Sequence, residues 1–355
     1  MNTLQRQSNI ELFRIIVMLG IVAHHFVVSS GLLDLMQPTL EYSNDVYLWL
    51  FGMWGKIGIN CFVLISGYFM CTSQFTWKKF IKLICEIEFY KILIYIAFLF
   101  FGRESISITR IFQVLSPITN LSTDFISGYL VMFLLVPFLN LLIQNLSKRQ
   151  HLYLIGLSLL FFTVWDQFPS VTIPMSYPIW FSVMYIIGAY IRHYPLQNNI
   201  ARFLFDSKLG AGLMVCAAMS SVLIMLLLRQ LGIISWWPHK WVADSNAPLA
   251  VLTSISCFNF FRKLDVKPNK LINTISASTF GVLLIHANSN AMRTFLWNDV
   301  CNCVGLHLSP YLPLYSIIVV LVVYIICTII DMLRINFLEK PMVTMINKIK
   351  NQNEL

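Results

Sequence analysis

The sequence has 355 residues, of which 57% are hydrophobic and only 12% are charged, and its mean hydropathy is +0.72. Soluble domains carry about 25% charged residues, so this composition excludes a water-soluble globule of this size. The 25 Lys and Arg residues outnumber the 16 Asp and Glu residues, which in a soluble protein would suggest a nucleic-acid partner. In a membrane protein, the anionic inner surface of the bilayer explains this excess, so we expect membrane lipid and no nucleic acid as a partner.

Uncharged stretches long enough to cross the bilayer recur along the chain, since about 20 apolar residues span its hydrocarbon core. The strong candidates cover 15–33, 57–77, 125–147, 167–191, 209–228, 271–292 and 300–330. Weaker candidates cover 81–101, 150–165 and 247–262. The sequence therefore predicts an all-α, polytopic membrane domain of about ten transmembrane helices over residues 1–345, followed by a short cytoplasmic tail, 346–355.

The distribution of Lys and Arg predicts the orientation, because these residues are retained on the cytoplasmic side of a membrane. If the N-terminus is inside, most Lys and Arg residues fall in the inner segments, and the outer segments hold only Arg103, Arg110, Arg229 and Lys240. Ten crossings then place both termini in the cytoplasm. We expect a multi-pass protein of the cell (inner or plasma) membrane.

Ionisable side chains inside the first predicted helix point to the chemistry, because each costs at least about 2.5 kcal/mol to insert and so faces a cavity or a partner. Arg14 and His25 are eleven residues apart, about three turns, and therefore share a helix face. Arg14 lies about 6 Å deep from the inner side and His25 about 22 Å deep. The plainer alternatives are a snorkelling Arg14 paired with Glu11, and a His25 that only hydrogen-bonds a neighbouring helix.

Lys56 and Asn60 lie one turn apart in the second predicted helix. Lys56 starts about 14 Å below the outer face, so it needs a partner there. An ion pair with Glu86 or Glu88 of the next helix would be a purely architectural explanation. The alternative is a role in a site.

His286 lies about 22 Å deep in the ninth predicted helix, at the depth of His25, and Arg293 follows it. Two histidines and Lys56 brought to one level by three helices predict a polar chamber in the outer half of the membrane. A proton pathway and a substrate pocket would both need such a chamber.

Lys78, Lys79 and Lys82 cluster at the inner start of the third predicted helix, with Lys79 and Lys82 on one face. Ordinary retention of positive charge on the inner side explains them. The alternative is a docking point for a phosphate-rich cytosolic ligand, which Arg14 would complete through two-point phosphate contacts.

Several common catalytic motifs are absent from the sequence. It has no Walker loop, no G-x-S-x-G, no H-E-x-x-H and no Cys/His zinc spacing. We therefore expect no metal site and no permanently bound cofactor, and ATP-driven transport and zinc proteolysis are disfavoured.

Several sequence elements occur together and in order. They are the Arg14 to His25 spacing, Gly55-Lys56-Ile57-Gly58-Ile59-Asn60-Cys61-Phe62 with Ser66-Gly67-Tyr68, Pro137-Phe138-Leu139-Asn140, Tyr185-Ile186-Ile187-Gly188-Ala189-Tyr190, Phe280 to His286, and Glu339-Lys340-Pro341. In these elements the chain resembles the acyltransferase family 3 membrane proteins, which O-acylate extracytoplasmic glycans.

The resemblance implies a ten-helix core, an acyl-CoA as cytosolic donor and a glycan or lipid-linked oligosaccharide hydroxyl as acceptor. Arg14 and His25 match the family's functional pair. Many members carry arginines where this chain has Lys79 and Lys82, and lysine lacks the planar two-point grip of arginine.

The resulting hypothesis is transfer of an acyl group, first of all acetyl from acetyl-CoA, to a polysaccharide hydroxyl, with His25 as general base. Arg14 would bind the donor or steady its thioester, and His286 would stabilise the oxyanion or position the acceptor. The expected substrate-binding residues are Lys56, Asn60, Glu11, Tyr185 and Arg293, and the expected donor-binding residues are Arg14, Lys79 and Lys82. Alternatives are a secondary transporter or glycan flippase, and a silent scaffold among polysaccharide-assembly proteins.

Overall fold

The structure is a computed structural model that describes residues 7–122, 124–168 and 176–341. These residues form helices and loops without a strand, which confirms the all-α prediction for the described part of the chain. The predicted domain end at residue 345 and the tail 346–355 lie outside the described residues. The α-helices are α1 (Ser8–Val28), α2 (Ser43–Phe51), α3 (Trp54–Met70), α4 (Trp77–Phe100), α5 (Ile108–Leu115), α6 (Phe125–Asn145), α7 (Lys148–Leu159), α8 (Tyr177–His193), α9 (Asn199–Asp206), α10 (Lys208–Gln230), α11 (Pro248–Lys263), α12 (Lys270–Ser276), α13 (Thr279–His286), α14 (Asn290–Thr294) and α15 (Leu312–Arg334).

Each of the ten stretches predicted to span the membrane overlaps at least one of these helices. Among the described residues, five segments are long and apolar enough to cross a bilayer: Ser8–Val28, Ser43–Met70, Phe125–Asn145, Lys208–Gln230 and Leu312–Glu339. Lys270–His286 and Asn290–Leu306 meet at 96° and add a sixth if they form one broken span. The remaining helices are shorter, as in α7, α8 and α11 with 12, 17 and 16 residues, or more charged, as in α4. The ten crossings and the cytoplasmic termini remain predictions.

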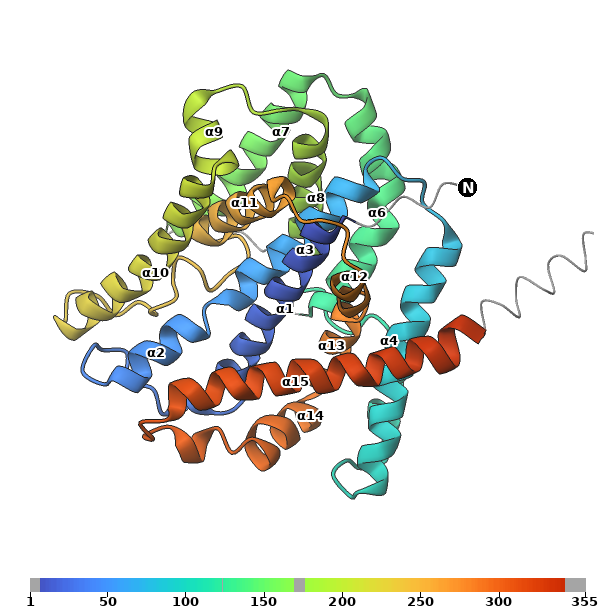
Figure 1. Cartoon of the computed structure of the whole chain (residues 1–355), viewed down its shortest axis with the longest axis vertical. Coiled ribbons are helices and arrows are strands. Elements are labelled where there is room, and N and C mark those ends of the chain that lie inside the picture. Colours follow the sequence, from blue (N-terminus) through green and yellow to red (C-terminus); the bar gives the residue numbers. More distant parts are fainter. Residues whose placement is uncertain (1–6, 123, 169–175, 342–355) are drawn as a thin grey trace, which may run out of the picture.

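Helix α3 packs against α1, α8 and α11 and so links the first helix to the middle of the chain (Figure 1). Glycines permit the close approach. A Cβ atom at Gly58 would lie 2.8 Å from Ile21 Cγ1 of α1, and one at Gly188 of α8 would lie 2.6 Å from the carbonyl oxygen of Leu64. Because small residues let helix backbones approach closely in membrane proteins, these positions fix α1 and α8 on α3.

The predicted ninth span, 271–292, is not one straight helix. It is divided into α12, α13 and the start of α14, and the chain turns sharply after His286. Short polar side chains explain the turn, because they offer the backbone other hydrogen bonds. The Asn288 amide donates to the carbonyl oxygen of Leu284 at 3.0 Å, and the Ser289 hydroxyl accepts from the Met292 amide at 3.2 Å to cap α14. His286 therefore lies at a helix end.

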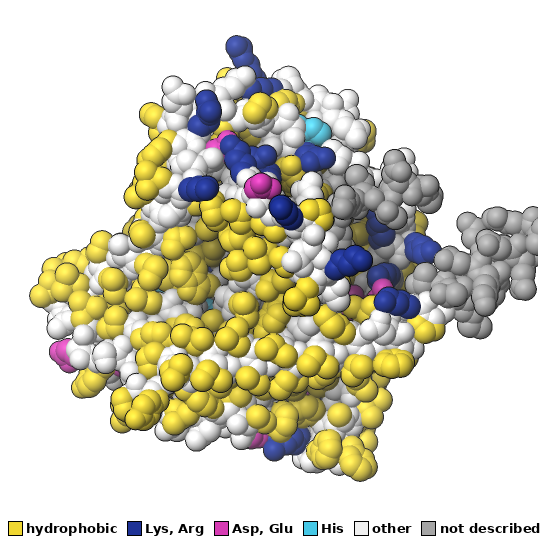
Figure 2. All heavy atoms as spheres, viewed as in Figure 1, with side chains coloured by type: hydrophobic (Ala, Val, Ile, Leu, Met, Phe, Trp, Pro, Cys, Tyr) yellow, Lys and Arg dark blue, Asp and Glu magenta, His cyan; other side chains and the backbone are white. Residues whose placement is uncertain are grey.

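The surface is dominated by exposed apolar side chains. Figure 2 shows hydrophobic side chains over the middle of the visible face, with Lys and Arg gathered mainly in its upper and right-hand parts. Phe100 and Ile325, for example, are 84% and 54% exposed. Apolar surface of this extent is typical of contact with lipid, which supports a membrane protein.

Candidate active site

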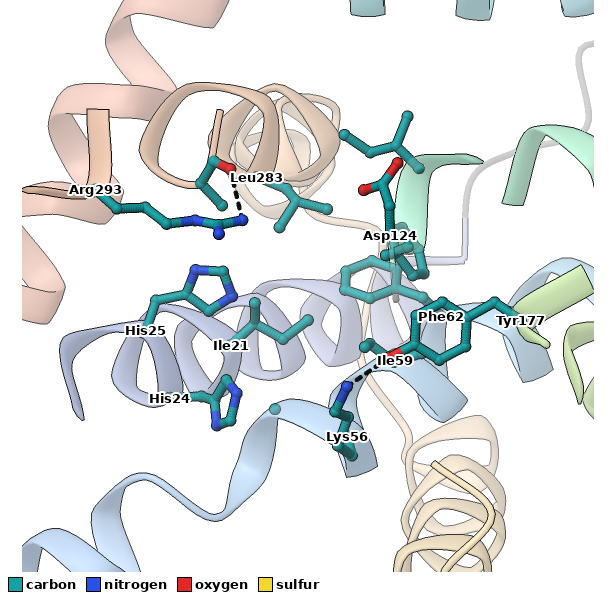
Figure 3. A pocket seen from close by; sticks show the side chains of 14 residues that line it. Ile21, His24, His25, Lys56, Ile59, Phe62, Asp124, Tyr177, Leu283 and Arg293 are labelled. Atoms are coloured by element: carbon teal, nitrogen blue, oxygen red, sulfur yellow. Dashed lines mark hydrogen bonds between the residues drawn. The ribbon is translucent and has the colours of Figure 1, made fainter. Parts of the chain in front are cut away.

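Three helices and the ends of three others enclose a polar cavity of about 130 Å³ (Figure 3). Helix α1 contributes its histidines, α3 its lysine and α13 Leu283, and the starts of α6 and α8 and the end of α14 complete the wall. The ionisable or hydroxyl-bearing residues that line it are His24, His25, Lys56, Asp124, Tyr177 and Arg293. The cavity thus brings together three of the predicted site residues, His25, Lys56 and Arg293.

His24 is fixed by the backbone of the loop before α3. Its Nδ1 lies 2.6 Å from the carbonyl oxygen of Gly52, and since a carbonyl only accepts hydrogen bonds, Nδ1 carries the proton. Gly55 leaves room for the ring, because a Cβ atom there would overlap it. The Nε2 of His24 is therefore the acceptor nitrogen.

His25 lies edge-on to His286, with ring centroids 5.1 Å apart and an interplanar angle of 66°. The Nδ1 of His286 lies 2.6 Å from the carbonyl oxygen of Val282, so it also carries the proton and Nε2 is the acceptor. Each ring of this pair has one buried nitrogen without a hydrogen-bond partner among the described residues: Nδ1 of His25 and Nε2 of His286. The two residues predicted at one depth are in contact.

Lys56 reaches across the cavity to the start of α8. Its Nζ donates to the Tyr177 hydroxyl at 2.5 Å and lies 5.2 Å from the centre of the Tyr177 ring. The architectural alternative, an ion pair with Glu86 or Glu88, is not found, because these carboxylates bind Arg334 at 2.8 Å and Lys91 at 3.6 Å. Helix α4 packs mainly against α5 and α13, so its carboxylates point elsewhere.

A second, larger cavity of about 730 Å³ adjoins the first and shares Asp124 and Arg293 with it. The Arg293 side chain is held in place because its Nη2 donates to the carbonyl oxygen of Ala287 at 3.1 Å. Most other lining groups are polar, among them Lys91, Glu104, Arg110, Gln113, Ser116, Asn288 and Asn290. This cavity is formed by α4, α5 and the segments before α6 and α14, most of which belong to the predicted outer side, and it is called the outer cleft below. The histidines lie next to this cleft.

The polar wall formed by α5 is tied to α4. Lys91 Nζ donates to the carbonyl oxygens of Gln113, at 2.9 Å, and Ser116. Arg110 of α5 forms an ion pair with Glu104. A lysine at the last carbonyls of a helix also interacts favourably with its dipole, so Lys91 acts as a C-terminal anchor for α5.

A family model described as an acyltransferase domain, that of acyltransferase family 3, matches residues 7–332. The chain belongs to this family. The predicted resemblance is thereby confirmed, and membership supports an acyl-transfer enzyme over the transporter and scaffold alternatives. Neither a curated protein nor a solved structure matches the chain.

Arg14 of the acyltransferase lies nearer the start of α1 and is not among the lining residues of either cavity. Its side chain is 32% exposed, its Nη1 lies 3.7 Å from Glu11 Oε2, and its Nε is buried without a partner among the described residues. Glu11 in turn accepts a hydrogen bond from the Ser276 hydroxyl of α12. The ion pair expected for Arg14 is present, and Glu11 is a buried link between α1 and α12 rather than a cavity wall.

Asn60 and Tyr185 of the acyltransferase are buried away from both cavities. Asn60 donates to the carbonyl oxygen of Ser245 at 2.6 Å and accepts from Trp180 Nε1 at 2.9 Å. The Tyr185 hydroxyl donates to Asn140 Oδ1 at 2.7 Å. The Asn60 amide and the Tyr185 hydroxyl both have hydrogen-bond partners within the protein, and the structure does not bring them to the cavity.

At the start of α4, Lys82 Nζ lies 2.6 Å from Glu339 Oε1, and Lys79 is exposed. Glu339 also binds Arg334 at 3.1 Å, and Arg334 binds Asp331 at 2.8 Å. The sequence element that begins at Glu339 therefore closes a charge network between α15 and α4. Lys79 and Lys82 lie beside this network and not beside the histidines.

Three of the six ionisable or hydroxyl-bearing cavity residues were not predicted: His24, Asp124 and Tyr177. Asp124 is the N-cap of α6, where its Oδ2 accepts from the Ser127 amide at 2.9 Å. An Asp directly before a long apolar run is a recognisable helix start, and this signal was available in the sequence.

No group of three or more His, Cys, Asp or Glu residues in the described part of the chain lies close enough to hold a metal ion.

Proposed function

We propose that the acyltransferase transfers a small acyl group, acetyl from acetyl-CoA in the first instance, to a hydroxyl of a cell-surface or lipid-linked polysaccharide. The observation that carries the proposal is the His25–His286 pair beside a cavity that adjoins the polar cleft on the predicted outer side. A hydroxyl acceptor needs a base, and histidine works as one near neutral pH.

His25 is the proposed base, and His286 is proposed to position it. A hydrogen bond from His25 Nδ1–H to His286 Nε2 would satisfy both unpartnered nitrogens at once. The anchor behind them is the Val282 carbonyl, which fixes the tautomer of His286. His25 Nε2 would then be the free acceptor nitrogen for the substrate proton, as in other base–orienter pairs.

The proposed step conserves atoms and charge. The acceptor hydroxyl gives its proton to His25 Nε2 while its oxygen attacks the thioester carbonyl carbon. The carbon–sulfur bond then breaks, and the leaving thiolate takes the proton from His25. The products are the ester and free coenzyme A.

Lys56 and Arg293 are the proposed stabilisers of the oxyanion that forms during attack. Both line the cavity that contains His25, and both are held by hydrogen bonds, to Tyr177 and to Ala287. Prearranged cationic donors of this kind lower the energy of developing negative charge in a low-dielectric site.

The proposed acceptor route is the larger outer cleft, whose amides and hydroxyls suit the hydrogen bonds of a sugar. The donor is proposed to arrive from the cytoplasm. Arg14, one-third exposed near the start of α1, together with Lys79 and Lys82, would bind its phosphates or steady its thioester.

Label transfer from acetyl-CoA tests the proposal. Membranes that contain the wild-type protein should move radiolabelled acetyl from acetyl-CoA to extracted polysaccharide, and His25→Ala should reduce the rate by about 10²- to 10⁴-fold. His193→Ala, an exposed histidine at the end of α8, is the matched control and should keep the wild-type rate. A normal rate in a correctly inserted His25→Ala protein would overturn the assignment.

A further inference from the structure

The end of the fold opposite the outer cleft contains a third cavity, of about 260 Å³, between the ends of α8 and α11 and the end of α9. Its ionisable lining residues are Arg192, Asp206, Arg262 and Lys263, with Tyr194 and Asn259 beside them. None of them belongs to the proposed catalytic cavity. In Figure 2, Lys and Arg side chains surround a few acidic ones over this region, near the α9 and α11 of Figure 1.

The charges in this cavity do not balance. Asp206 is shared by two cations, with Arg262 Nη2 at 3.2 Å from Oδ1 and Lys263 Nζ at 2.5 Å from Oδ2. Arg192 has no ion pair within the described ranges. A fourth cation, Lys148, lies with its Nζ 5.9 Å from the centre of the Tyr194 ring. The lining therefore has an excess of positive charge with one carboxylate to offset it.

The arginines are held before any ligand arrives. Arg192 Nη1 donates to the Tyr68 hydroxyl at 3.0 Å, and its guanidinium carbon lies 4.8 Å from the centre of the Tyr68 ring. Arg262 Nε donates to Asn259 Oδ1 at 3.1 Å. Planar, prearranged guanidinium groups favour two-point binding to anions with paired oxygens, such as phosphate and carboxylate.

The cavity also lies next to the helix that contains the proposed catalytic residues. The Asn9 amide of α1 donates to the carbonyl oxygens of Phe261 and Arg262, at 3.0 and 2.9 Å, at the end of α11. His25 lies sixteen residues farther along α1, about 24 Å along the helix axis. A ligand bound in the cavity would therefore lie at the opposite end of α1 from the histidines.

We infer that this cavity is a binding site for a phosphate ester, which no comparison assigns. Its volume is below the roughly 300–1,000 Å³ of a site for a whole drug-sized ligand, so it would take the phosphate-bearing part of a larger molecule. Two sources share this chemistry: the nucleotide end of the acyl-CoA donor and an anionic lipid headgroup. The donor alternative relies on the proposed function, and the headgroup alternative does not.

Direct binding to the purified full-length protein tests the inference. The probes are coenzyme A, dephospho-coenzyme A, and nanodiscs of phosphatidylcholine with or without phosphatidylglycerol. Arg192→Gln and Arg262→Gln should each weaken binding of one phosphate source roughly tenfold to a hundredfold, since a charge-assisted hydrogen bond is lost. Arg202→Gln is the matched control, because Arg202 is an exposed arginine of α9 that does not line the cavity.

Asp206→Asn should change the binding affinity in the opposite direction, which a misfolded variant would not do. Removing the carboxylate should tighten binding of the same probe, because it competes with phosphate for Arg262 and Lys263. If Arg192→Gln and Arg262→Gln lose coenzyme A binding, the ligand of the cavity is the acyl-CoA donor. If they lose phosphatidylglycerol retention, the ligand is the lipid headgroup. If Arg192→Gln and Arg262→Gln bind both probes as Arg202→Gln does, the inference is overturned. Coenzyme A binding that depends on Arg192 in a protein without acyl transfer would refute the proposed function alone.

Discussion

His25 and His286 come from helices that are far apart in the chain, yet their rings meet edge-on with centroids 5.1 Å apart. The facing pair holds one buried Nδ1 and one buried Nε2 that lack partners among the described residues. Since His286 Nδ1 is already committed to the Val282 carbonyl, the only role left for Nε2 is to accept. A hydrogen bond between these two nitrogens would satisfy both and would orient His25, which is what a histidine base requires.

Substitution of His286 tests the positioning role. His286→Ala should lower kcat for acyl transfer roughly tenfold to a hundredfold, a part of the 10²- to 10⁴-fold that a well-placed base contributes. The KM for acetyl-CoA should change little, because His286 is not proposed to touch the donor. His286→Gln retains an acceptor oxygen and should recover part of the rate. Equal losses in the two variants, measured by steady-state label transfer, would mean that His286 only fills space.

Lys56 offers a test of the proposed oxyanion stabilisation. Lys56→Met keeps most of the side-chain volume but removes the charge, and should lower kcat by about 10²- to 10³-fold, the usual effect of losing one such donor. Tyr177→Phe leaves the ammonium in place and removes only its hydroxyl partner at 2.5 Å, so its effect should be much smaller. Activity assays on protein purified to the same monodispersity compare the two. A larger loss in Tyr177→Phe would instead make the tyrosine the functional group.

The depth of the histidines could be predicted from the sequence, whereas their neighbours could not. The rise of an α-helix is uniform, so counting residues placed His25 and His286 at one level, and the rings are indeed in contact. Which helices pack together depends on side-chain shape, so the sequence left open whether Lys56 pairs with Glu86 or Glu88 or belongs to a site. The partner of Lys56 is Tyr177 because α8 and α6 close the cavity, while α4 lies against α5 and α13.

The sequence could not show which polar side chains already have partners inside the protein. Asn60 and Tyr185 lie on helices that line or approach the site, but each already has a hydrogen-bond partner inside the protein. A membrane interior requires such satisfaction, so an intramembrane amide or phenol more often joins helices than binds substrate. Several polar residues of the cavity wall lie instead at helix ends, as Asp124 does at the start of α6.

Lys91 provides a test of the outer cleft as the acceptor route. Lys91→Met removes the ammonium that binds the carbonyl oxygens of Gln113 and Ser116, so α5 should move more freely over the cleft. We expect the KM for the polysaccharide acceptor to rise several-fold with the KM for acetyl-CoA unchanged. Arg103→Met, an exposed cation that does not line the cleft, is the control. A change confined to the donor KM would contradict the proposed route.

The burial of His239 predicts how the free energy of unfolding depends on pH. It lies in the loop between α10 and α11, is 5% exposed, and its Nε2 donates to the Trp49 carbonyl oxygen at 2.6 Å. Burial lowers the pKa of His239 to about 4, against an ordinary value of 6.5. Between these values the unfolded chain binds a proton that the native protein does not, so stability is complete above about pH 6.5 and falls as the pH drops toward 4.

The size of the effect follows from the same shift. About 1.4 kcal/mol per pKa unit gives up to about 3 kcal/mol for this group. Thermal unfolding in detergent at pH 7, 6, 5 and 4 measures it, with His239→Gln as the variant whose side chain does not titrate. His239→Gln should lose less stability than the wild type over this range because one titrating group is missing. Parallel curves for the two proteins would show that His239 is not buried in its neutral form.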